Sequence, residues 1–70
     1  MRRRELLKLI RERAEMFEIT FCLLREGSNH TIYRLGNSSI KVGRHSSLKP
    51  GDVRATLHET EKELGVKWWQ

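Results

Sequence analysis

Residues 19–42, ITFCLLREGSNHTIYRLGNSSIKV, decide the fold of this chain of 70 residues. Three stretches rich in β-branched, aromatic and other apolar residues, 19–24, 30–35 and about 39–42, alternate with short segments of glycine, asparagine and serine. Glycine and asparagine tolerate positive φ, and serine bonds to nearby backbone, so these segments are typical of turns. The pattern predicts three consecutive strands joined by short hairpin connections.

An amphipathic helix is predicted before the strands, from about Arg3 to Met16. Apolar residues recur there at the spacing of one helical face, while Arg, Lys and Glu fill the other positions. This face continues to the residue after the helix and consists of Leu6, Leu7, Ile10, Ala14 and Phe17.

A second helix is predicted after a loop at residues 43–51. Asp52 is expected at its N-cap or in its first turn, where a carboxylate satisfies free N–H groups and favours the helix dipole. Gly65 is expected to end it. One face is buried, with spacing 0, 4, 7 and 11: Val53, Leu57, Thr60 and Leu64.

These elements predict an α+β fold in the order α-β-β-β-α, with a three-stranded antiparallel sheet and both helices on one face. The other sheet face is open. Residues 1–70 form a single domain with a core at about 4–65 and a tail at 66–70, in which Trp68 and Trp69 are expected to pack back on the core. The predicted common core is Leu6, Ile10, Phe17, Val53, Leu57 and Leu64.

The composition indicates the cell compartment of the protein and excludes one means of stabilising its fold, a disulfide within the chain. Cys22 is the only cysteine, so no disulfide can form within one chain, and we interpret it as a small buried hydrophobe. No apolar run approaches the roughly 20 residues that cross a bilayer. The basic start, Arg2 to Arg4, is not followed by the apolar segment of a signal peptide. We therefore expect a cytoplasmic protein.

The formal net charge of +5 is concentrated in two blocks. Residues 1–13 hold six basic and two acidic side chains, and residues 25–54 hold another six and two. Blocks of this kind are typical of proteins that bind a polyanion. The first helix begins with three arginines, Arg2, Arg3 and Arg4, at an end where the helix dipole disfavours cations. This effect is too weak to decide whether they bind RNA, bind an acidic protein or extend into solvent.

Two runs resemble the HicA family of toxin components: REGSNHTIYR at residues 25–34 and VGRHSSLKPGDVR at 42–54. In that family a Gly-Ser-x-His turn opens the second strand, and a basic-His pair leads through a Lys-Pro-Gly-like loop into the last helix. The resemblance covers about residues 4–65. One departure is the run Glu15 to Glu18, where many members have a glycine-containing turn.

The resemblance implies a fold like that of double-stranded RNA-binding domains and a metal-independent endoribonuclease that cleaves mRNA without a cofactor. It also implies a HicB-type antitoxin partner that neutralises the toxin. The family's catalytic histidine falls on His30. Histidine suits proton transfer to and from RNA oxygens, because both of its protonation states are populated near neutral pH.

Six further residues are candidates for RNA binding. Ser28 and Asn29 precede the histidine, and Lys41 is expected on the open sheet face if its neighbours are buried. The remaining candidates lie in the second motif, where cations contact phosphates without sequence preference: Arg44, His45 and Lys49. Gly27 is expected to supply an unusual backbone angle.

The remaining titratable residues support no further site. The single cysteine and the three histidines lack the short ligand spacings of zinc sites. His45 is the only candidate for the second imidazole of an acid–base pair with His30. A structural or phosphate-binding role is nevertheless the expected one for His45. His58 is expected to be solvated.

Two other functions remain open from the sequence. A non-catalytic module of the same fold would bind RNA by shape and phosphate contacts. A protein lying on a membrane surface would use the basic first helix, but the core needs most of that helix's apolar stripe.

Overall fold

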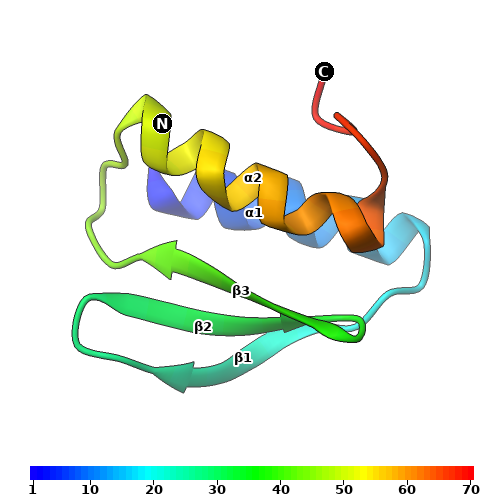
Figure 1. Ribbon diagram of the computed structural model, residues 1–70, viewed down its shortest axis with the longest axis horizontal. Helices are drawn as coiled ribbons and strands as arrows, with labels where there is room; N and C mark the ends of the chain where they lie inside the picture. Colours follow the sequence, from blue (N-terminus) through cyan, green and yellow to red (C-terminus); the bar gives the residue numbers. More distant parts are fainter.

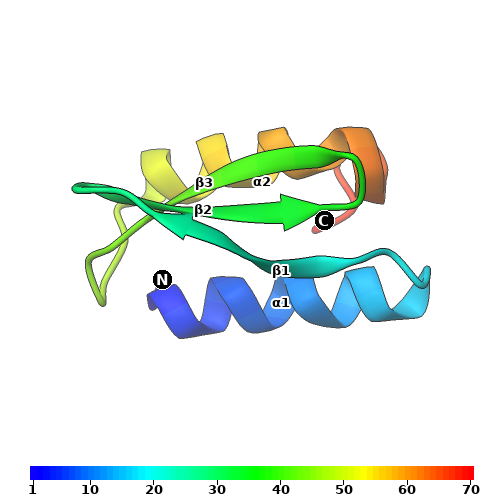
Figure 2. The same ribbon diagram turned by 90° about the horizontal axis from the view of Figure 1, so that it is seen from below.

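The computed structural model describes all residues, 1–70, and has the elements α1 (Arg3–Met16), β1 (Phe21–Glu26), β2 (His30–Leu35), β3 (Ser38–Gly43) and α2 (Pro50–Leu64). The strands form one antiparallel sheet in the order β1-β2-β3. Both helices lie on the same side of this sheet (Figures 1 and 2). The predicted α+β fold in the order α-β-β-β-α is confirmed.

The first strand begins two residues later than predicted. Ile19 and Thr20 belong to the connection after α1, where Glu18 adopts a left-handed backbone with φ of 55° and the Ile19 N–H donates to the Ala14 carbonyl at 2.8 Å. Glu18 thus takes, without glycine, the conformation that most often ends a helix. The second strand has the predicted bounds, and the third is one residue longer at each end.

The core lies between the sheet and the two helices. Residues 40 and 42 of β3 are fully buried, and Lys41 between them is exposed, so its predicted orientation toward the open face is confirmed. The buried apolar residues are Leu6, Leu7, Ile10, Ala14, Leu35, Ile40, Val42, Leu48, Leu57 and Leu64. Val53 is only half-buried and packs against this cluster.

Two residues predicted to be buried are exposed. Phe17 is 52% exposed because α1 ends at Met16, and its ring instead packs under the Arg13 guanidinium at 4.6 Å. Cys22 is exposed and pairs with Arg34 across β1 and β2. It alternates with Phe21, which packs against the core, so Cys22 points to the face that the helices leave open.

The outer edge of β3 is covered by α2. The Thr56 hydroxyl donates to the Lys41 carbonyl at 3.0 Å, and the Lys41 N–H donates to the Glu59 carboxylate at 2.9 Å. These bonds satisfy backbone groups that an uncovered edge strand leaves free. They also fix α2 beside Lys41.

The C-terminal tail packs on the core, as predicted. The Trp68 indole N–H donates to the Thr60 hydroxyl at 2.7 Å, and Trp69 lies edge-on to the His58 ring. The His58 Nδ1 also forms a hydrogen bond with the Glu61 carboxylate at 2.8 Å. His58 is therefore not merely solvated, as the sequence suggested. Gly65 ends α2 with φ of 103°. Neither helix has the length and apolar character needed to span a membrane.

Candidate nucleic-acid interface

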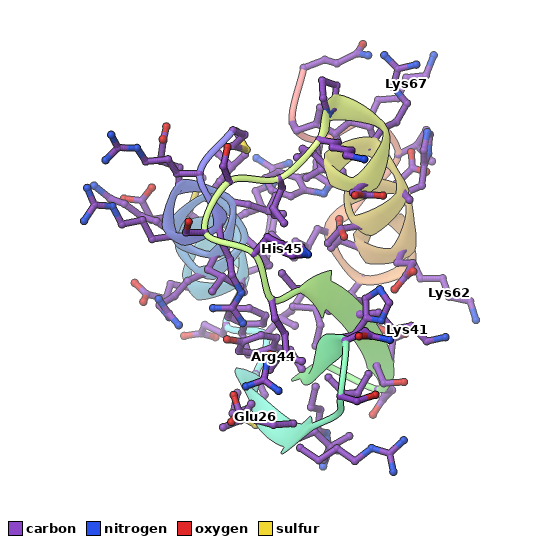
Figure 3. All side chains as sticks on the ribbon, turned by 90° about the vertical axis from the view of Figure 1, so that its left-hand side faces the viewer. Glu26, Lys41, Arg44, His45, Lys62 and Lys67 are labelled. Carbon is purple, nitrogen blue, oxygen red and sulfur yellow. The ribbon has the colours of Figure 1, made fainter.

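The register between β2 and β3 places His30 beside a loop. His30, the first residue of β2, pairs with Gly43, the last residue of β3. The chain leaves the sheet there, so Arg44 and His45 begin the connection to α2 next to the turn that precedes His30. Figure 3 looks onto this end of the molecule, where Arg44 extends toward Glu26 and His45 lies on the loop leading to α2.

All seven site residues predicted from the sequence line one open cleft of about 880 Å³. They come from three segments: the turn before β2 together with the first residue of β2, strand β3, and the loop before α2. Each of the seven is exposed. They are Ser28, Asn29, His30, Lys41, Arg44, His45 and Lys49. We refer to this hollow as the His30 cleft.

One wall of the His30 cleft comes from α2, which the sequence analysis did not assign to the site. Its cleft-lining residues are Asp52, Ala55, Thr56 and Glu59. Their helical spacing of three, four and seven residues places them on one face, next to the buried face. The sequence alone shows that these four residues share a helix face. That this face lines the cleft follows only from the packing of α2 against β3. The site therefore lies along the α2 edge of the sheet and not across its open face.

Arg44 and Gly27 hold the first turn against the loop. The Arg44 guanidinium donates to the Gly27 carbonyl at 2.8 Å and lies 4.0 Å from the Glu26 carboxylate. The expectation of an unusual backbone angle at Gly27 is wrong, since its φ is not positive. Glycine avoids a tight contact there, because a Cβ would lie 3.0 Å from the His30 carbonyl, which accepts the Gly27 N–H.

Arg3 fastens the start of α1 to the sheet beneath the cleft. Its guanidinium donates to the Gly43 carbonyl at 2.9 Å, the Thr31 hydroxyl at 3.0 Å and the Tyr33 hydroxyl at 3.5 Å. Of the three N-terminal arginines, Arg3 is thus structural and does not extend into solvent. Arg3 thus joins Thr31, the residue after His30, to Gly43, the residue before Arg44.

The cleft combines imidazoles, cations and carboxylates. Of the three histidines, only His58, which lies outside the cleft, has a side-chain hydrogen bond within the chain. The rings of His30 and His45 are therefore available to a ligand. The cleft has a formal net charge of +1 when its histidines are neutral, from Lys41, Arg44 and Lys49 against Asp52 and Glu59.

Comparison with known proteins finds no match to this chain among family models, curated proteins or solved structures.

Proposed function

We propose that this chain is an endoribonuclease of the HicA type, the toxin of a type II toxin–antitoxin system, acting on mRNA in the cytoplasm with His30 as its catalytic residue. The observation that carries the proposal is the common cleft. Seven residues, selected in the sequence for RNA chemistry and spread over residues 28–49, line one hollow. The hollow brings together two imidazoles that make no side-chain hydrogen bond within the chain and three cations.

The cleft supplies the groups that metal-independent RNA cleavage needs. One imidazole, His30, takes the proton of a ribose 2′-OH as that oxygen attacks the adjacent phosphorus. The bond from phosphorus to the 5′-oxygen breaks, and an acid, for which His45 is the second imidazole of the cleft, protonates the leaving oxygen. The products are a 2′,3′-cyclic phosphate and a 5′-hydroxyl. Lys41 and Lys49 stabilise the charge on the phosphorane.

The same surface suits an antitoxin of the HicB type. Because the cleft is open and its cations lie at the surface, a protein that inserts acidic side chains there would exclude RNA. Neutralisation would need no change in the fold of the toxin.

Replacement of His30 tests this function. His30→Ala should lower RNA cleavage at least ~100-fold, since a positioned proton-transfer group contributes about 10²–10⁴. Its melting temperature should stay near that of the parent, because His30 is exposed. His58→Ala is the matched control, a histidine outside the cleft, and should cleave at the parent's rate. Cleavage should persist in EDTA, as the HicA resemblance implies.

A His30→Ala protein that cleaves as fast as the parent would exclude His30 as the catalyst. Toxicity on expression gives an independent measurement, and His30→Ala should relieve it while His58→Ala should not.

An RNA-binding module without nuclease activity is the second candidate. The observation that favours it is that no side chain of the protein bonds the His30 ring, whereas catalytic histidines are commonly oriented by a third group. A parent protein that binds RNA with a steep salt dependence, but releases no cyclic phosphate, would establish this function instead.

A further inference from the structure

A second hollow, of about 640 Å³, lies at the same end of the molecule as the His30 cleft. Its lining contains four arginines and two serines, with no carboxylate and no apolar residue: Arg2, Arg3, Arg4, Arg44, Ser46 and Ser47. We call it the arginine hollow. Its formal charge is +4, from four arginines and no acid, compared with +1 for the His30 cleft. The larger net positive charge therefore lies beside the cleft that holds His30 and His45, and not within that cleft.

Tertiary pairing brings the two halves of the arginine hollow together. Arg2 forms an antiparallel bridge with Ser47, and the Arg3 N–H donates to the Ser46 carbonyl at 2.9 Å. The Leu48 N–H donates to the Met1 carbonyl at 2.8 Å and extends this pairing. Backbone contacts between residues 1–3 and 46–48 therefore bring the two halves of the hollow side by side.

The fold uses only part of the charge in this hollow. Arg3 and Arg44 bond to protein oxygens, but the guanidinium groups of Arg2 and Arg4 make no hydrogen bond or ion pair within the chain. Arg2 and Arg4 are exposed, so their guanidinium groups are available to a ligand.

The arginine hollow adjoins the His30 cleft. Arg44, Ser46 and Ser47 line both, so the loop at residues 44–47 is the ridge between them. A polyanion bound in the cleft would pass over this ridge and meet Arg2 and Arg4 on its far side.

We propose that the arginine hollow is a second phosphate subsite, which binds the backbone of the same RNA strand on one side of the bond that His30 cleaves. The inference rests on the proposed function for its ligand. Arg2 and Arg4 neutralise phosphates, and the Ser46 and Ser47 hydroxyls donate to phosphate oxygens. Contacts to phosphates carry no sequence information, so the subsite adds affinity and a preference for longer RNA without a preference for sequence.

The test measures binding of 2′-O-methyl RNA, which cannot be cleaved because it lacks the 2′-OH. Two single-stranded probes are compared, of about 4 and about 12 nucleotides, a range typical of single-strand sites. Arg2→Ala/Arg4→Ala is compared with Lys8→Ala/Arg54→Ala, which removes the same charge from exposed positions outside both hollows. Thermal melting confirms that both variants fold.

The hollow variant should bind the longer probe several-fold more weakly than the control variant and should bind the shorter probe equally well. Its salt dependence on the longer probe should be flatter by about 1.4, from roughly 0.7 for each of two phosphates. Equal affinity and equal salt dependence of the two variants would overturn the inference. Failure of the parent to cleave ordinary RNA would instead contradict the proposed nuclease, while the length dependence on uncleavable RNA would still decide the subsite.

Discussion

The two ends of the sheet differ in how their polar residues are used. Figure 1 shows the β2–β3 turn and the C-terminal tail at one end, and the loop between β3 and α2 at the other. At the end that holds the β2–β3 turn and the tail, several polar side chains bond to the protein itself. The Ser38 hydroxyl donates to Glu63 at 2.8 Å, and Trp68 donates to Thr60. The Thr60 hydroxyl in turn donates to the Leu57 carbonyl at 2.6 Å, so this buried group is fully satisfied. We call this the tail end.

At the opposite, loop end, most polar side chains have no partner in the chain. The exceptions, which fix the walls of the hollows, are Arg3, Arg44, Thr56 and Glu59. The free groups include both imidazoles of the cleft and the cations on either side of the ridge. The difference indicates that the tail end stabilises the fold and the loop end is available to a ligand. Substitutions should therefore separate stability from RNA binding and cleavage.

The largest effect on stability is expected for Leu64→Ala. Leu64 ends α2 and is 3% exposed within the core. Removing its side chain should lower the free energy of unfolding by about 2–5 kcal/mol, enough to unfold much of so small a domain. Val66→Ala, at a residue that is 80% exposed, is the control and should change little. Chemical denaturation measures both. A Leu64→Ala protein as stable as the parent would show that the tail end does not carry the core.

An intermediate effect is expected for Gly36→Ala. Gly36 has φ of 60° in the β2–β3 turn, and a Cβ there would collide with the Glu63 carboxylate. The left-handed backbone alone costs an L-residue about 1–2 kcal/mol, so Gly36→Ala should lower stability by at least that amount. RNA cleavage by the folded fraction should not change. Loss of cleavage at temperatures where the variant remains folded would contradict the separation of the two ends.

Glu18→Gly is the reciprocal change, because Glu18 has the same backbone conformation without being glycine. Relief of that strain, offset by the greater freedom of unfolded glycine, should raise stability by about 0.5–1 kcal/mol. A decrease would indicate that the Glu18 side chain contributes more than its backbone costs.

The smallest effect concerns Glu61 and depends on pH. The hydrogen bond from His58, and then that from the Lys67 N–H, hold the pKa of the Glu61 carboxyl below its ordinary value of 4.5. Because the folded-state pKa is lowered, the carboxylate stabilises the fold above pH 4.5, and this contribution is lost as the pH falls through the folded-state value. Melting temperatures of the parent and Glu61→Gln should therefore differ slightly at neutral pH and converge in acid. A difference that stays constant across this range would contradict the stabilising role of the carboxylate.

Local signals in the sequence determined most of the fold. The periodicity of α1 and the turn residues at 27–29 and 36–38 gave correct element types, and α1 and β2 have the predicted bounds. Errors occurred where an element ends. Phe17 continues the apolar spacing of α1, but the chain turns before it, so spacing alone could not show that it is exposed. Cys22 was misassigned because burial in a strand depends on which face the helices cover.

The sequence by itself also determined which residues can perform RNA chemistry, since side-chain type sets charge and proton transfer. Only the tertiary structure decided which of them meet. The pairing of His30 with Gly43 and the contact of α2 with Lys41 bring distant segments to one cleft. The pairing of Arg2 with Ser47 does the same for the arginine hollow. Such contacts depend on register and packing between residues far apart in the chain, and no local pattern encodes them.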